Sequence, residues 1–193
     1  MADKGTACIF VFDGFADWEP ASALAELRRT FGFSVQAIAL AKHRVTSMGG
    51  LEVIPSAEVS EVRADAVDIL ILPGGEAWMR GEIPAVTALV RSVTGAGRPV
   101  AAICAATLAL AHAGLLDERR HTSNGEEFIS RYAPAYRGHR LYQKARAVTD
   151  GNVITANGLA PFAFAAEIFR AVAPERPSDI AAYEALYSRG MVD

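Results

Sequence analysis

Cys104 is the residue whose type and setting most clearly suggest chemistry. It follows residues 99–103, a short apolar run typical of a buried strand, and it precedes residues 105–112, an alanine-rich run typical of a helix. A tight strand-to-helix turn with small neighbours holds a nucleophile out at the carboxyl edge of a sheet, and the N–H groups at a helix start favour a thiolate. We therefore expect a nucleophilic Cys104. The alternative is a small buried cysteine without reactivity.

Two glycines follow another buried strand, residues 67–72. Gly74 and Gly75 come directly after Pro73, and glycine lets backbone N–H groups approach a ligand closely. Together with the N–H of Ala105, they are candidates for binding a negatively charged oxygen. A plain turn is the alternative, and the pairing with Cys104 one strand–helix unit later favours a site.

Two carboxylates, Asp17 and Glu19, follow the first strand, residues 7–12. The carboxyl ends of parallel strands meet at one edge of a sheet, so either side chain can reach the edge where Cys104 lies. A buried, protonated acid there would donate a hydrogen bond to the sulfur and pass a proton, whereas an ionised acid would raise the thiol pKa. The residues alone favour a simpler interpretation, in which both acids stabilise the start of the helix at residues 18–30.

The histidines and cysteines show no metal-binding spacing. His43, His112, His121 and His139 form no cluster, the two cysteines form no C-x-x-C pair, and Cys8 lies inside a strand without a turn beside it. We expect no metal and no cofactor, and we expect Cys8 to be structural. His112 lies late on the helix after Cys104 and is expected to be structural or solvated, whereas His121 lies nearer the expected site and is a possible base.

The elements that position these residues alternate between short apolar runs and helical stretches. Such alternation predicts an α/β fold, with a mostly parallel sheet covered by helices on both faces. The strands are expected at residues 7–12, 34–40, 67–72, 99–103, 146–148 and 153–156, with a pair of short strands within 44–54 and a possible short strand at 121–123. The helices are expected at residues 18–30, 84–93, 105–112, 160–172 and 180–189. No linker or repeat divides the chain, so residues 1–193 are expected to form a single domain.

Composition narrows the classes of partner. The chain has 19 Lys and Arg against 22 Asp and Glu, which gives a net charge of -3 and disfavours binding to nucleic acid or to an anionic membrane. The N-terminal residues lack a signal-peptide pattern, so we expect a cytoplasmic protein with reduced thiols. The partner that we expect is a small-molecule substrate of Cys104.

Three segments in order resemble the ThiJ/PfpI superfamily. They are residues 14–19 (GFADWE), residues 71–75 (ILPGG) and residues 101–105 (AAICA), and residues 154–158 (ITANG) are also similar to this superfamily. It includes intracellular protease- and amidase-like proteins and isocyanide hydratases, and it is related by fold to class I glutamine amidotransferases. The resemblance implies a flavodoxin-like three-layer sandwich, usually a homodimer. It also implies that Cys104 is the nucleophile, that Glu19 is a protonated acid beside its sulfur, and that Gly75 and Ala105 bind the oxyanion.

The chain departs from this pattern in three ways. The residue after the nucleophile is Ala105, where the protease branch carries a histidine, and the late H-x-E of the glutaminases is missing. Many members carry a histidine at the end of a short strand after the nucleophile helix, and here the matching segment is residues 121–124 (HTSN), with Asn124 at the histidine position. Protease and glutaminase activity are therefore not expected. An enzyme acting on a small electrophilic or amide-like substrate, by hydrolase, amidase or hydratase chemistry, is the leading hypothesis. A non-catalytic, redox-sensing or stress-response protein with an oxidisable Cys104 is the alternative, and a relative without activity is a third.

Overall fold

Seven strands form the central sheet of the computed structural model, which describes residues 4–189. Their order is β5-β2-β1-β6-β7-β9-β8, and every pair is parallel except β8 and β9. The strands are β1 (Thr6–Phe10), β2 (Ser34–Ala39), β5 (Ala57–Glu58), β6 (Ile69–Leu72), β7 (Val100–Ile103), β8 (Ala147–Asp150) and β9 (Val153–Ala156). The chain runs from β1 outward to β2 and then returns to β6 on the other side of β1. This reversal of strand order is where ligands bind in open α/β sheets.

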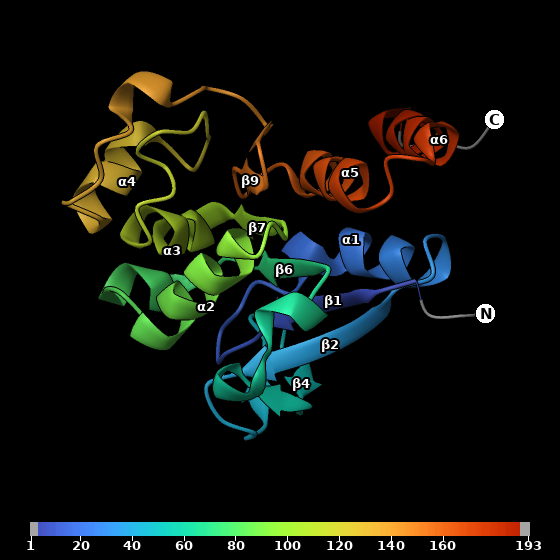
Figure 1. Ribbon diagram of the computed structural model, residues 1–193, viewed down its shortest axis with the longest axis horizontal. Coiled ribbons are helices and arrows are strands. Elements are labelled where there is room, and N and C mark those ends of the chain that lie inside the picture. Colours follow the sequence, from blue (N-terminus) through green and yellow to red (C-terminus); the bar gives the residue numbers. More distant parts are fainter. Residues whose placement is uncertain (1–3, 190–193) are drawn as a thin grey trace.

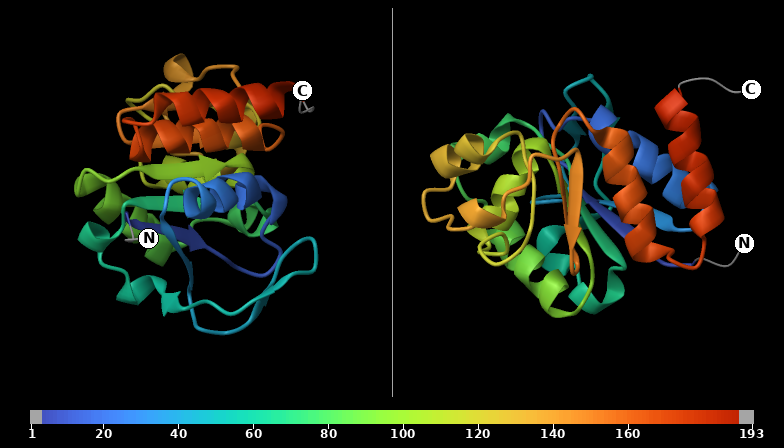
Figure 2. Two further views of the ribbon diagram at one scale, coloured as in Figure 1. Left: turned by 90° about the vertical axis from the view of Figure 1, so that its right-hand side faces the viewer. Right: turned by 90° about the horizontal axis from the view of Figure 1, so that it is seen from above.

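Helices cover both faces of the sheet (Figures 1 and 2). On one face lie α1 (Trp18–Arg29), α5 (Pro161–Val172) and α6 (Pro177–Arg189), with α5 packed between the other two. On the other face lie α2 (Pro84–Gly95) and α3 (Thr107–His112), and α4 (Glu126–Tyr132) packs against α3. The three-layer α/β fold expected from the sequence is therefore confirmed.

The central strands are apolar throughout because each of their faces is covered. In β6, Leu70 and Leu72 pack into the core beneath α2 and α3, while Ile69 and Ile71 pack beneath α1 and α5. The strand β7 divides in the same way, with Ala102 on the first side and Ile103 on the second. Burial on both faces fixes the register of these strands. It therefore also fixes the positions at which they end, at the edge that carries the candidate site.

A small hairpin stands beside this edge. It consists of β3 (Val45–Thr46) and β4 (Glu52–Val53), which pair antiparallel, as expected for residues 44–54. The single-turn 3-10 helices are η1 (Val59–Glu61), η2 (Ala64–Ala66), η3 (Glu76–Arg80), η4 (Cys104–Ala106) and η5 (His139–Leu141). The turn η4 directly follows the end of β7, and η3 begins after the three residues 73–75 that follow β6.

Two expectations about the elements were wrong, and some elements were not expected. The helix after Cys104 begins at Thr107 rather than at residue 105, because residues 104–106 form the tighter turn η4. Residues 121–123 form no strand, and only an isolated bridge joins His121 to Tyr142. The two-residue strand β5 was not expected, since so short a segment carries no detectable period.

The aromatic side chains between α1, α5 and α6 lead to a stability prediction. Phe169 is fully buried, with its ring stacked on Phe31 at a centroid distance of 4.7 Å and an edge contact to Tyr183 at 5.0 Å. Phe169→Ala should lower the free energy of unfolding by about 3–5 kcal/mol, because it leaves a cavity between three helices. Phe162 on the same helix is 46% exposed, and Phe162→Ala should lower it by less than about 1 kcal/mol. Urea unfolding measures both, and equal losses would contradict this packing.

Candidate active site

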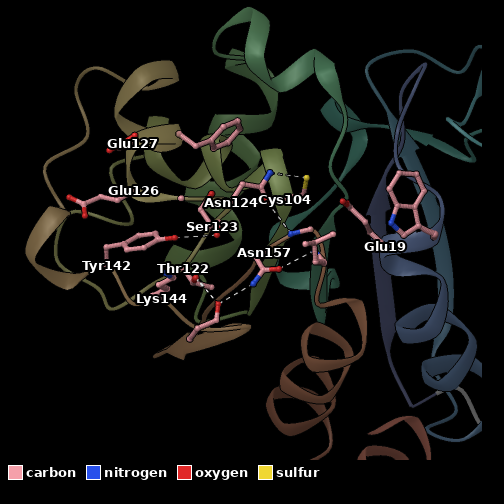
Figure 3. A pocket seen from close by; sticks show the side chains of 16 residues that line it. Glu19, Cys104, Thr122, Ser123, Asn124, Glu126, Glu127, Tyr142, Lys144 and Asn157 are labelled. Carbon is pink, nitrogen blue, oxygen red and sulfur yellow. Dashed lines mark hydrogen bonds between the residues drawn. The ribbon is translucent and has the colours of Figure 1, made fainter. Parts of the chain in front are cut away.

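Cys104 lies at the carboxyl end of β7 in a strained conformation. Its φ is +61°, and it is the one residue other than glycine with a positive φ among residues 4–189. This region costs an L-residue roughly 1–2 kcal/mol, so the surrounding structure must hold it there. The strained turn places the half-buried sulfur at the rim of a pocket (Figure 3). Strain of this kind is typical of a functional position.

Two glycines leave room for the sulfur and its neighbour. A Cβ at Gly158 would lie 2.8 Å from Cys104 Sγ, and a Cβ at Gly74 would lie 2.7 Å from Glu19 Oε2. Any larger residue at either position would push these groups apart. The sequence pattern alone did not indicate the need for Gly158, although this residue lies in the last segment that resembles the superfamily.

Glu19 is buried in the first turn of α1, with 1% of its surface exposed. Its Oε2 accepts a hydrogen bond from the Gly74 N–H at 2.6 Å, and its carboxyl group also bonds the Cys104 thiol. Burial raises the pKa of Glu19 to about 7, against the opposing effects of these two hydrogen bonds. The carboxyl group therefore exists in both protonation states near neutral pH, whereas the sequence led us to expect a protonated acid.

The Gly74 N–H is not directed at a substrate oxygen, contrary to the expectation from the sequence. It donates to Glu19 instead. The Gly75 N–H forms no hydrogen bond within the described part of the chain, and Gly75 and Ala105 both line a small hollow beside the sulfur. These two backbone groups remain the candidates for binding an oxyanion.

The Cys104 thiol is a weaker acid than the turn before α3 suggested. Burial, and then the charge of Glu19, raise its pKa to about 11, although hydrogen bonds from Asn124 and from the Ala105 backbone act in the opposite direction. Burial therefore acts against the thiolate that the start of a helix was expected to favour. Desolvation outweighs the donors that face the sulfur, and the neutral thiol predominates near pH 7.

Asn124 bridges the sulfur to the loop after β9. Its Nδ2 donates to Cys104 Sγ at 3.1 Å, and its Oδ1 accepts from the Gly158 N–H at 3.0 Å. Figure 3 shows this side chain directed at Cys104. Asn124 thus lies beside the sulfur, as expected for the residue that stands at the superfamily's histidine position. An amide donor cannot take up a proton from the thiol.

His121 lies away from the sulfur. It is fully buried, with Nδ1 2.6 Å from the Arg119 carbonyl oxygen and Nε2 2.6 Å from the Tyr136 hydroxyl. Facing a carbonyl, Nδ1 must carry the proton and donate. Burial is the main cause that lowers the pKa of His121. Both ring nitrogens are engaged, so the alternative in which His121 serves as the base is not what the structure shows.

The Asp17 side chain forms a hydrogen bond with the β3–β4 hairpin and not with Cys104 or with the first turn of α1. It occupies the N-cap position of α1, but its side chain makes no capping hydrogen bond. Its Oδ1 instead accepts from the Gly49 N–H in the turn between β3 and β4, at 3.1 Å. The local pattern of an acid before a helix could not reveal this partner, which lies 32 positions further along the chain.

Two hollows meet at Cys104. The larger has a volume of about 960 Å³, and the smaller has a volume of about 220 Å³. Cys104, Glu19, Asn124 and Trp18 line both of them. The larger hollow is also lined by polar side chains that the sequence analysis did not single out: Thr122, Ser123, Tyr142, Lys144 and Asn157. Three of them lie in the segments 121–124 and 154–158, where other residues were considered, and Tyr142 and Lys144 come from a segment without a motif.

Nothing in residues 4–189 suggests a metal centre or a membrane span. No three His, Cys, Asp or Glu side chains lie close enough together to hold an ion in this part of the chain. No helix within the same residues has the length and apolar character needed to cross a bilayer.

Comparison with known proteins identifies the family. The pattern of the DJ-1/PfpI family matches residues 5–171. The protein named uncharacterized protease YoaZ from Bacillus subtilis (strain 168) is 36% identical over 169 residues, which cover 84% of this chain and 80% of that protein. The crystal structure of the DJ-1 superfamily protein Atu0886 from Agrobacterium tumefaciens has a TM-score of 0.85 at 36% identity, covering 95% of this chain and 99% of that one. The thiJ/pfpI family protein from Bacillus anthracis has a TM-score of 0.82 at 37% identity, covering 89% and 84%. The chain belongs to the DJ-1/PfpI family.

Proposed function

We propose that this protein is an enzyme in which the sulfur of Cys104 adds to the electrophilic carbon of a small carbonyl- or amide-like substrate. The observation that carries the proposal is the contact between a strained cysteine and a buried carboxyl group whose pKa is raised to about 7. Such a carboxyl group can accept a proton and return it at neutral pH, which is what general acid–base catalysis requires. Metal and cofactor are not part of the proposal.

In the first step the thiol gives its proton to the Glu19 carboxylate while the sulfur forms a bond to the substrate carbon. The π electron pair of the C=O bond moves to the oxygen, which becomes negatively charged. The N–H groups of Gly75 and Ala105, which line the hollow beside the sulfur, are placed to donate to that oxygen. The thiolate need exist only as the bond forms, so a thiol pKa of about 11 is compatible with this step.

In the second step Glu19 returns the proton. With an amide, the C–N bond breaks as the proton reaches the leaving nitrogen, and the thioester that remains is hydrolysed by water. With a nitrile, which takes up water overall, the proton goes to the nitrogen of the adduct. Water then forms a C–O bond to the same carbon, the C–S bond breaks, and the sulfur recovers a proton from that water. Glu19 thus acts first as base and then as acid.

Peptidase and glutaminase activity are not part of the proposal. Those reactions use an imidazole to move protons, and here Asn124 lies beside the sulfur while His121 bonds Tyr136. The redox-sensor alternative is weakened by the raised thiol pKa, because the thiolate is the form that oxidants attack. The homodimer and the cytoplasmic location remain predictions from the sequence.

Replacing the nucleophile tests the proposal. Cys104→Ser should lower turnover by at least about 10³-fold, since a serine hydroxyl is a much weaker acid than a thiol and a carboxylate is too weak a base to activate it. Cys8→Ser is the matched control, because Cys8 is buried in the sheet and its pKa is likewise raised to about 11. A panel of small aldehydes, nitriles and amides followed by proton NMR gives the rates. Turnover that survives in Cys104→Ser would refute the assignment.

Glu19→Gln should lower the pKa of Cys104. The substitution removes a negative charge that raises this pKa, and the new amide can donate to the sulfur. The thiolate form should therefore appear at lower pH in the variant than in the wild type. Ultraviolet absorbance of the thiolate during a pH titration measures this, with Cys8→Ser as the background of both proteins. An unchanged or higher thiol pKa would show that Glu19 does not interact with the sulfur as described.

Asn124→Ala should have the opposite effect on the thiol. The hydrogen bond from Asn124 to Sγ, at 3.1 Å, lowers the thiol pKa, so its removal should raise that pKa. Loss of one hydrogen bond to a charged group should slow alkylation of Cys104 by iodoacetamide about tenfold at a fixed pH below the thiol pKa. Asn157→Ala removes a different amide from the same pocket and should leave the rate unchanged. Equal rates in both variants would contradict the role of Asn124.

A further inference from the structure

The smaller hollow beside Cys104 has a different character from the larger one. Its volume is about 220 Å³, and its apolar lining consists of Ala16, Trp18, Met48, Met79 and Phe128, together with Ala105. It borders Gly75 and Ala105, which do not line the larger hollow. When the oxygen of a substrate accepts hydrogen bonds from these two N–H groups, the substrate atoms next to its electrophilic carbon therefore lie at this hollow.

Met48 reaches the hollow because the hairpin turn is tied to the segment before α1. The Met48 N–H donates to the Phe15 carbonyl at 2.8 Å, and the Gly49 N–H donates to Asp17 Oδ1 at 3.1 Å. A Cβ on Gly49 would lie 2.4 Å from Asp17 Oδ2, so the turn is pressed closely against this carboxylate. Met48 itself is 50% exposed, and its position depends on these bonds more than on burial.

The charges around the hollow restrict what it can accept. Glu19 and Glu76 both line it, and no Lys or Arg among residues 4–189 does so. An anionic group would be repelled by these carboxylates. A methionine side chain adapts its shape to small apolar groups because it is unbranched and polarisable.

We propose that this hollow is the subsite for a short, uncharged apolar group that lies within a few bonds of the electrophilic carbon, with Met48 as its outer wall and Asp17 as the positioning residue that holds that wall. The proposal rests on the proposed function, since it assigns the substituent of the same substrate. Each methylene that enters the hollow leaves water, which strengthens binding by up to about fourfold. Because the hollow is small, binding should stop improving once the apolar group fills it.

Alkylation of Cys104 by a homologous series of reagents tests the subsite. Iodoacetamide and its N-methyl, N-ethyl and N-propyl derivatives each form an S–C bond with the cysteine and expel iodide, so they differ only in the apolar substituent. Mass spectrometry of Cys104 gives the half-saturating concentration and the maximal rate for each reagent. In the wild type, the half-saturating concentration should fall by up to about fourfold per added carbon, with little change in maximal rate.

Variants of the hairpin and its anchor separate positioning from stability. Met48→Ala and Asp17→Ala should lose most of the gain along the series, when each variant is compared with its own reaction with iodoacetamide. Asp17→Asn keeps an oxygen that accepts from Gly49 and should keep the gain. Leu51→Ala removes an apolar side chain from the same hairpin that is 60% exposed and outside the hollow, and it should also keep the gain. A wild type without preference along the series, or a Met48→Ala variant that retains it, overturns the proposal.

A second measurement does not depend on a reactive cysteine. In protein labelled with ¹³C at the methionine methyl groups and carrying Cys104→Ser, N-propylacetamide should shift the Met48 resonance and acetamide should not. Met48→Ala assigns that resonance. If iodoacetamide fails to label Cys104 but the methyl resonance shifts, the proposed function fails and the subsite stands. If labelling occurs without alkyl preference and the resonance does not move, the subsite alone fails.

Discussion

A carboxyl group buried beside a sulfur is the constraint on which the candidate site depends. Glu19 is almost fully removed from water, and its partners are the Gly74 N–H and the Cys104 thiol. The raised pKa of Glu19 means that its contribution to folding stability is present below the ordinary carboxyl pKa and is lost as the pH rises through about 7. The protein therefore keeps a group that weakens the fold at neutral pH, which is typical of a residue kept for chemistry.

The strain at Cys104 is held by the elements on either side of the turn. The strand β7 lies between β6 and β9 and is buried on both faces, so it cannot shift to relieve the turn. After the turn, Thr107 Oγ1 donates to the Cys104 carbonyl at 2.8 Å and is 2.7 Å from Ser123 Oγ. The central sheet and this buried hydroxyl pair together offset a backbone conformation that would relax in a free peptide.

Asn124 changes the chemistry that this arrangement supports. A histidine beside the sulfur would take its proton, whereas the Asn124 amide only donates to it and at the same time binds the Gly158 N–H. Proton transfer is left to Glu19. A site with one titrating partner suits addition to an activated carbon better than cleavage of a stable peptide bond, for which catalytic triads use an imidazole to carry the proton to the leaving nitrogen.

Much of this arrangement follows from the sequence alone. Continuous apolar runs identify the buried strands of the central sheet, and the change from strand to helix period around residue 104 identifies the turn. The order of the three segments around Glu19, Gly74 and Cys104 is sufficient to place these residues at one edge, because parallel strands end on the same side. These features are local, and local spacing is what a sequence displays directly.

The tertiary structure decided the hydrogen-bond partners of the site residues. The Gly74 N–H donates to Glu19, 55 positions away, and not to an oxyanion. Asp17 accepts from Gly49 in the hairpin and does not cap its helix. His121 faces Tyr136, and desolvation makes the thiol a weaker acid than the start of a helix alone would predict. Hydrogen-bond partners and burial depend on segments that meet only after folding. The sequence therefore determined which residues gather at the edge, and packing determined their protonation and their partners.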